Sequence, residues 1–141
     1  MRIADAMTPE PITVRADASA TTAAKIMRDH DLGSLPVVEN DRLVGFLTDR
    51  DIIVRCVANE NECASASIGE IMSPDAFCCR DDQSPDDVMR MMSVKQVYRM
   101  PVIDGEDRLV GIVTLGALAE RSGEPEAVCS TIKAVRSPVN A

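Results

Sequence analysis

Two turns in the sequence combine residue types that could bind a small ligand. In the first, Gly45 stands three residues before Thr48, and Asp51 follows three residues after it. A carboxylate at the start of a helix can accept hydrogen bonds from both hydroxyls of a ribose, and the nearby backbone N–H groups attract anions. Gly45 leaves room for a ligand to approach the strand backbone closely. The turn therefore offers acceptors and space for a hydroxylated or phosphorylated ligand.

The same spacing also has a purely structural interpretation. Thr-x-x-Asp at a helix start is the pattern of a capping box, in which Thr48 and Asp51 bond each other's backbone N–H. Both interpretations stay open on spacing alone. Arg50 could contact phosphates, pair with Asp49 or lie in solvent, and Arg55 is expected to be solvated. No catalytic residue and no metal site is predicted, because the chain has one histidine and no C-x-x-C motif.

The turn occurs twice because the chain is a duplication. The offset between matching residues is 65 in the first half of each copy and 66 after one inserted residue. The matching stretches are 7–9 with 72–74, 35–38 with 100–103, and 42–48 with 108–114. Agreement over so many ordered positions is improbable by chance, and a fixed period indicates a repeat architecture. The turn that contains Thr114 is thus the counterpart of the turn that contains Thr48.

Each copy predicts the same order of elements, β-α-β-β-α. A short strand at 11–14 or 76–79 precedes a helix that begins at Ser19 or Ser84, and serine is a favoured N-cap residue. The first helix should end near Gly33. Two strands rich in β-branched residues then form a hairpin, and a second helix begins at the threonine of the turn.

These elements predict an α/β (α+β) fold of tandem repeats packed sheet to sheet about a pseudo-twofold axis. Each unit alone would bury too little surface to be comfortably stable. The expected boundaries are 1–60 and 68–122 for the repeats, 61–67 for a linker, and 123–141 for a tail whose short helix ends at Pro138.

Composition narrows the classes of protein that fit. With 45% hydrophobic and 27% charged residues, the chain has the composition of a globular protein. Its apolar runs are shorter than the ~18 residues of a membrane span, and the N-terminus is a poor secretory signal. A net charge of −8 opposes nucleic acid as a partner. Five cysteines without a metal motif favour a reducing cytoplasm.

The repeated motifs resemble those of a CBS-domain pair, or Bateman module. Met-Thr/Ser-Pro, apolar-Pro-Val-apolar and Gly-apolar-x-Thr each occur twice, and the resemblance covers residues 1–121. Residues 48–52, Thr-Asp-Arg-Asp-Ile, are typical of small stand-alone bacterial members. The resemblance implies a regulatory protein, not an enzyme, that binds an adenosine-containing ligand between paired hairpins. AMP, ADP, ATP, NAD and S-adenosylmethionine are the candidate ligands, and none of them serves as a catalytic cofactor.

The resemblance also assigns residues by position. Thr48 and Asp51 would hold the ribose, and Ile12-Thr13-Val14 with Pro36-Val37 would wall the adenine. Arg99, which precedes the Pro-Val strand of the second copy, would reach the phosphate from the opposite repeat.

The second turn departs from the family pattern at one position. Ala117 stands where the first turn has Asp51. A hydrogen bond to a charged group is worth about 1.5–3 kcal/mol, so its loss would weaken ribose binding roughly ten- to a hundredfold. Thr114, Pro101 and Val102 are therefore expected to form a weaker second site.

The resemblance further implies a homodimer that signals in trans to a separate regulated protein. The candidate dimer contacts, each also a candidate core residue, are Ile53, Val57, Leu115 and Leu118. Two alternative functions stay open. One is an interaction module that binds no nucleotide, which Ala117 and the negative charge favour, and the other is a thiol-based stress sensor that uses Cys78 and Cys79.

Overall fold

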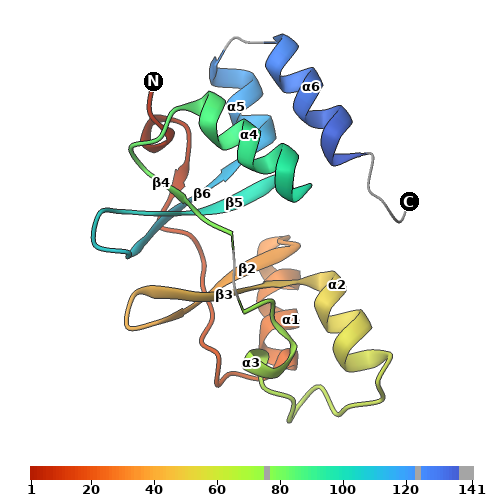
Figure 1. Ribbon diagram of the computed structural model, residues 1–141. Coiled ribbons are helices and arrows are strands. Elements are labelled where there is room, and N and C mark those ends of the chain that lie inside the picture. The colour runs from red at the N-terminus through yellow and green to blue at the C-terminus, as the bar shows by residue number, and fades with distance from the viewer. Residues whose placement is uncertain (75–76, 123–124, 137–141) are drawn as a thin grey trace. The chain divides into compact units, whose positions relative to one another are not determined.

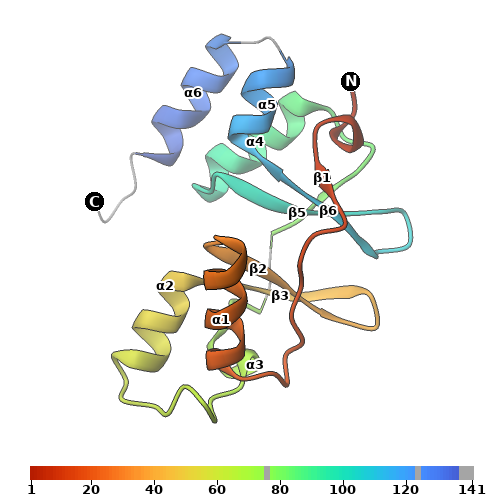
Figure 2. The same cartoon turned by 180° about the vertical axis from the view of Figure 1, so that it is seen from behind.

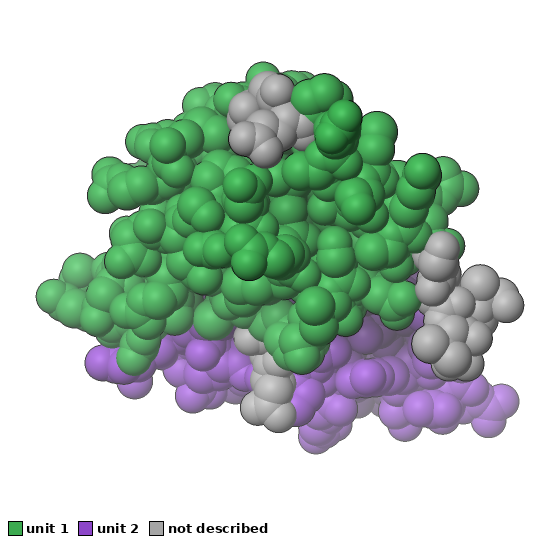
Figure 3. Space-filling view, turned by 45° about the horizontal axis from the view of Figure 1, so that its top comes forward, with its two compact units in different colours: residues 1–11, 77–141 green, residues 12–76 purple. Residues whose placement is uncertain are grey.

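The chain folds into two units whose limits differ from those of the sequence repeats. The computed structural model describes residues 1–74, 77–122 and 125–136. Unit 1 joins residues 1–11 to residues 77–141, and unit 2 comprises residues 12–76, as coloured in Figure 3. The opening residues of the chain thus belong to the same unit as its second half.

Unit 2 is built on a two-stranded hairpin. β2 (Ser34–Glu39) pairs antiparallel with β3 (Arg42–Thr48). Asn40 and Asp41 between them have φ of 52° and 64°. Two successive residues with positive φ give a turn whose twist matches that of the flanking strands. The predicted hairpin is confirmed. Asn40 and Asp41 suit its tip because Asn and Asp tolerate positive φ.

Helical segments pack beside this hairpin in unit 2 (Figure 1). They are α1 (Ala20–His30), the single turn α2 (Asp49–Ile52) with its continuation as a π-helix (Ile53–Val57), and α3 (Ile68–Ile71). Their apolar faces and the hairpin enclose one buried cluster. The predicted second helix therefore begins at Thr48, as expected, but changes to wider π-type turns after four residues.

Unit 1 contains a four-stranded sheet. Its strand order is β1 (Thr8–Pro9), β6 (Leu109–Thr114), β5 (Arg99–Ile103) and β4 (Cys79–Arg80). β4 runs parallel to β5, and the other neighbours are antiparallel. The second predicted hairpin, β5–β6, is confirmed as the centre of this sheet.

The helices of unit 1 include the predicted tail helix. A 3₁₀ turn (Ile3–Asp5) precedes α4 (Pro85–Lys95), α5 (Leu115–Ser122) and α6 (Pro125–Val135). α6 lies beside α4 and α5 in both views of the chain (Figures 1 and 2). The predicted end of this helix at Pro138 lies outside the described residues. Within the described part of the chain, no helix has the length and apolar character needed to cross a membrane.

The N-terminal caps of α1 and α4 are the predicted residues, and the C-terminal caps are not. Ser19 and Ser84 accept hydrogen bonds from the N–H three residues on, at 3.0 and 3.2 Å, so both predicted starts are confirmed. α1 ends at Asp31 in the left-handed conformation, with φ of 53°, and α4 ends in the same way at Gln96, with φ of 56°. The first helix thus ends near Gly33, as expected, but Asp31 and not the glycine takes the left-handed position.

The first segment of the chain packs in unit 1. Ile3 is fully buried and Ala6 is 3% exposed in the core of that unit. β1 then pairs with β6, with Thr8 opposite Ile112. This segment belongs to the first sequence repeat, yet it completes the sheet of the second.

The matching segment of the second repeat packs in unit 2. Ile68 and Ile71 are buried in its core. Ser73 and Phe46 then exchange two backbone hydrogen bonds of 3.0 Å each, at the place where Thr8 and Ile112 meet in unit 1. The two repeats have therefore exchanged their opening segments.

Two expected strands are shorter than predicted. Residues 11–14 form only an isolated bridge, in which Val14 lies parallel to Val37. Pro11 lacks the N–H that a longer ladder would need. The strand expected at 76–79 starts at Cys79, and Ala76 lies outside the described residues.

Candidate functional site

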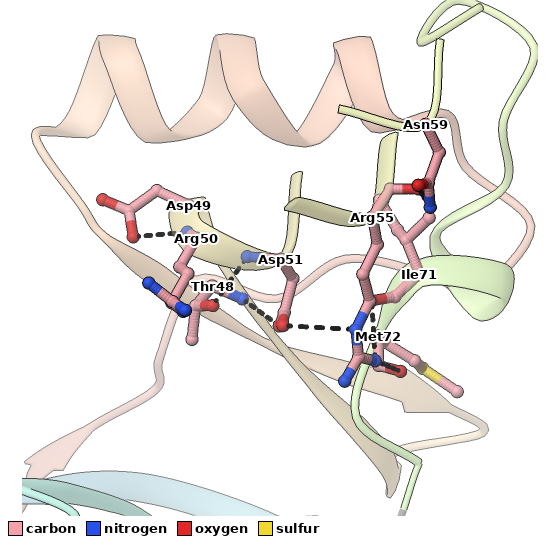
Figure 4. A network of polar contacts seen from close by, with 8 residues as sticks. All are labelled: Thr48, Asp49, Arg50, Asp51, Arg55, Asn59, Ile71 and Met72. Atoms are coloured by element: carbon pink, nitrogen blue, oxygen red, sulfur yellow. Dashed lines mark hydrogen bonds and ion pairs between the residues drawn. The ribbon is translucent and has the colours of Figure 1, made fainter. Parts of the chain in front are cut away.

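The turn at Thr48 is a complete capping box. The Asp51 N–H donates to Thr48 Oγ1 at 3.1 Å, and the Thr48 N–H donates to Asp51 Oδ2 at 2.9 Å (Figure 4). Thr48 has extended backbone angles, as an N-cap residue does. The structural interpretation of this spacing is confirmed. The capping bonds also fix the two side chains that the resemblance assigns to a ribose.

Arg55 holds Asp51 from the other side. Its Nε lies 3.9 Å from Asp51 Oδ1, and its Nη1 donates to the carbonyls of Ile71 and Met72 at 3.3 and 3.0 Å. Arg55 is therefore exposed, as expected, but its guanidinium is held by two backbone carbonyls beside Asp51 and is not surrounded by solvent alone (Figure 4). The spacing of four between Asp51 and Arg55 on a helix is the sequence signal that could have revealed the pair.

Arg50 lies in the same turn but takes no part in this network. Its backbone N–H donates to Asp49 Oδ1 at 2.8 Å. Its guanidinium forms no ion pair with Asp49 or with any other residue that the structure describes. Of the alternatives for Arg50, side-chain pairing with Asp49 is not observed, and contact with a phosphate stays a prediction.

The glycines of the two turns make room for protein, not for ligand. A Cβ on Gly45 would overlap the Met72 sulfur and lie 3.0 Å from the Ser73 carbonyl oxygen. A Cβ on Gly111 would meet Met7 in the same way. The expectation that Gly45 admits a ligand is wrong, because the exchanged opening segment fills that space. Each Met-Thr/Ser-Pro motif is thus the packing partner of the glycine in the opposite repeat.

The residues expected to wall an adenine are mostly core residues. Val14 is 5% exposed, Val37 is fully buried, and its neighbour Pro36 is buried as well. The Val14 N–H donates to the Pro36 carbonyl at 3.1 Å. Thr13 keeps a half-buried side chain, and Ile12 is 39% exposed. Contact of this segment with an adenine stays a prediction, and it would involve Ile12, Thr13 and backbone groups more than the buried side chains.

The second turn keeps half of the capping box. The Ala117 N–H donates to Thr114 Oγ1 at 3.1 Å, and alanine has no carboxylate to return the bond. Pro101 and Val102, the other residues of the expected second site, are buried in the sheet. The helix α5 nevertheless begins here, so the threonine alone is enough to start it.

Arg99 lies next to Thr114, opposite it in the β5–β6 ladder. It is exposed, and its guanidinium has no hydrogen bond or ion pair with the described residues. The two residues border a hollow of about 390 Å³ in unit 1. Its lining consists of Tyr98, Arg99, Thr114, Leu115, Gly116, Ala119, Val128 and Ile132. Thr48 and Asp51 belong to unit 2, so the role of Arg99 toward a ligand held there stays a prediction.

Two of the four candidate dimer contacts are core residues. Leu115 is 4% exposed and Leu118 is fully buried in unit 1. Ile53 and Val57 are instead 60% and 57% exposed on the π-helix of unit 2. The second pair alone is free to contact another molecule.

Both repeats match the model of a known protein family. A model of the CBS domain matches residues 3–57 and again residues 68–124. The chain therefore belongs to the CBS domain family. It is a CBS-pair regulatory module, made of two tandem CBS repeats, as the sequence motifs predicted.

Two curated relatives match along most of their length. The CBS domain-containing protein YhcV of Bacillus subtilis is 35% identical over 130 residues, which are 92% of this chain and 91% of that protein. Hypoxic response protein 1 of Mycobacterium tuberculosis is 39% identical over 120 residues, which are 84% of this chain and 82% of that protein. Both are similar to this chain across the two repeats.

Solved structures agree with this assignment. Hypoxic response protein I, crystallised with two coordinated zinc ions, has a TM-score of 0.79 and 36% identity, covering 85% of this chain and 98% of that one. The CBS domain pair of protein MJ0100, in complex with 5′-methylthioadenosine and S-adenosyl-L-methionine, has a TM-score of 0.75 and 31% identity, covering 87% and 96%. In this chain, no three His, Cys, Asp or Glu side chains among residues 1–74, 77–122 and 125–136 gather as metal ligands would.

Proposed function

We propose that this CBS pair binds an adenosine-containing ligand through Thr48 and Asp51, and that a separate protein responds to the bound state. AMP, ADP, ATP, NAD and S-adenosylmethionine are the candidate ligands. The protein acts as a regulator and not as an enzyme. Nothing in the sequence motifs combines a nucleophile, a base and an orienting group.

The observation that carries this proposal is the unused hydrogen-bonding capacity of a fixed carboxylate. Asp51 Oδ2 accepts one hydrogen bond, from the Thr48 N–H. Oδ1 lies 3.9 Å from Arg55 Nε, which is beyond hydrogen-bond distance, and no described residue donates to it. An ionised carboxylate has about four acceptor positions. A ribose can therefore donate to Asp51 without breaking the cap.

The second turn supports the same conclusion by contrast. α5 starts with a threonine cap and no carboxylate, so the fold does not require an aspartate at this position. The carboxylate of the first turn is then free to serve a ligand. The CBS pair of MJ0100, 31% identical to this chain, holds two adenosine compounds. This relative supports the chemical class of ligand that we propose.

The proposal is tested by ligand-dependent thermal unfolding of the intact chain. AMP, ADP, ATP, NAD, S-adenosylmethionine and 5′-methylthioadenosine are each added at millimolar concentration. A ligand at about 100 times its dissociation constant adds ~2.7 kcal/mol of stability, which raises the melting temperature of a chain of this size by several degrees. If none of the six compounds changes the melting temperature, the proposal is wrong.

The site is tested by Asp51→Ala, which should weaken binding about ten- to a hundredfold. Asp87→Ala is the matched control, because Asp87 follows the N-cap Ser84 at the same spacing in α4. Both variants remove an acidic residue from a helix start, and only Asp51→Ala should lose affinity in calorimetric titration. If Asp51→Ala binds as tightly as the wild type, the ligand is held elsewhere.

We further propose that the protein forms a homodimer through the exposed face of the π-helix. Ile53, Val54 and Val57 are 60%, 44% and 57% exposed there. Three neighbouring apolar side chains in contact with water favour association with another apolar surface. Light scattering of Ile53→Asp should show a monomer where the wild type is a dimer.

A further inference from the structure

Two cysteines that are separated in sequence meet in unit 2. Cys56 lies on the π-helix and is fully buried, and Cys63 lies in the loop before α3 and is half-buried. Their sulfur atoms are 2.7 Å apart. A disulfide bond is about 2.05 Å long, so the two sulfurs are already close to bonding distance.

Backbone contacts hold both cysteines in place. The Asn61 N–H donates to the Cys56 carbonyl at 3.1 Å, and the Thr21 N–H donates to the Cys63 carbonyl at 3.0 Å. Both thiols also approach the Asn61 carbonyl oxygen, at 3.8 and 3.9 Å. Cys63 is thus attached to the first turn of α1, and Cys56 to the helix that carries Asp51. A bond between them would close the loop between the π-helix and α3, next to the first turn of α1.

We propose that Cys56 and Cys63 are a redox-active dithiol that closes to an intramolecular disulfide when the protein meets a small-molecule disulfide such as oxidised glutathione. The proposal is independent of ligand binding at Thr48 and Asp51. It also differs from the sequence-based alternative, which placed a thiol sensor at Cys78 and Cys79.

The reaction proceeds by two exchanges. The half-buried Cys63 meets the reagent first, and its thiolate attacks one sulfur of the small disulfide and releases one thiol. Cys56 then gives up its proton and attacks the Cys63 sulfur, which releases the second thiol. The protein loses two protons and two electrons, and the reagent takes them up and is reduced to two thiols. The hydrogen bond with Cys63, together with burial, raises the pKa of Cys56 to about 11, so Cys56 is the second thiol to react.

The remaining cysteines lack these features. Cys79 is 1% exposed, and burial raises its pKa to about 12. Burial, followed by the nearby Asp107, also raises the pKa of Cys78. A raised pKa disfavours the thiolate that reacts with disulfides, in these residues as in Cys56. Among the described residues, however, no hydrogen bond joins the Cys78 and Cys79 sulfurs as one joins those of Cys56 and Cys63. Cys129 is exposed, and the structure describes no other cysteine sulfur in contact with it.

The test uses the intact wild-type chain treated with oxidised glutathione. Remaining thiols are blocked with N-ethylmaleimide, and the unreduced protein is digested with a protease that cleaves after glutamate. Glu60 and Glu62 lie between the two cysteines, so the cleaved peptides stay together only if a disulfide joins them. We expect a linked pair with Cys56 and Cys63, lighter by two hydrogen atoms than the two free peptides.

A stability measurement with matched variants completes the test. The loop between the cysteines is short, and its closure should raise the melting temperature of the oxidised protein by roughly 5–10 °C. Cys129→Ser should keep this increase, and Cys63→Ser should lose it. Recovery of both peptides unlinked and alkylated would overturn the proposal. Linkage of Cys63 to a second chain, or an increase that persists in Cys63→Ser, would overturn it as well.

Discussion

The turns at Thr48 and Thr114 have the same backbone design and different chemistry. In both, a threonine hydroxyl accepts a hydrogen bond of 3.1 Å from the N–H three residues on. Only the first turn returns that bond from a carboxylate, which Arg55 then approaches. The second turn instead borders a hollow beside Arg99. A helix can therefore start at this turn with or without the carboxylate.

The strongest test of the shared design is a methyl group on each turn glycine. Gly45→Ala and Gly111→Ala should each lower the free energy of unfolding by about 1–3 kcal/mol, because the new Cβ would press on Met72 or Met7 and on a backbone carbonyl. Urea unfolding measures both losses. Gly105→Ala is the control, because nothing lies within 4 Å of its Cβ position. A Gly111→Ala variant as stable as Gly105→Ala would show that the two units are packed differently.

The chemical difference is sharpened by Arg99→Ser, which installs the residue found at the matching position of the first repeat, Ser34. If Arg99 contacts a phosphate, the variant should bind AMP about tenfold more weakly, because a hydrogen bond to a charged group is lost. 5′-Methylthioadenosine has no phosphate and should bind unchanged. Calorimetric titration of both compounds separates this result from a general loss of folding, which would weaken both.

The smallest expected effect comes from Ala117→Asp, which makes the second turn like the first. The new carboxylate can accept from the Thr114 N–H, as Asp51 does from Thr48, and should add about 0.5–1 kcal/mol to stability. Thermal unfolding measures this gain. In the presence of an adenosine ligand, calorimetry should also show a larger number of bound molecules per chain. An unchanged stoichiometry would mean that the second turn lacks more than the carboxylate.

Much of the fold could be predicted because its signals are local. Ser19, Ser84 and Thr48 each cap the helix that the sequence assigned to them. Both hairpins also follow from their β-branched strands and polar turns. The left-handed residue Asp31 was missed because Gly33, two residues later, is the commoner choice for that conformation. Gln96 was missed because glutamine is not a typical residue for it.

The features that escaped prediction depend on contacts between distant residues. Periodicity and composition are the same whether Met7 packs on the glycine of its own repeat or of the other, so the exchange of segments has no sequence signature. Arg55 finds two backbone carbonyls, and any backbone carbonyl can accept a hydrogen bond. Cys56 and Cys63 meet because the π-helix and the following loop turn back on each other. Local sequence patterns do not indicate which residues form these contacts.

The exchanged opening segments also determine the order in which the chain can fold during synthesis. The sheet of unit 2 needs Ser73 beside Phe46, so it can close soon after residue 76 has left the ribosome. The sheet of unit 1 needs Thr8 beside Ile112, a residue made more than a hundred positions later. Thr8 and Pro9 cannot pair with β6 until that residue has been made. The earliest part of the nascent protein is among the last to find its place.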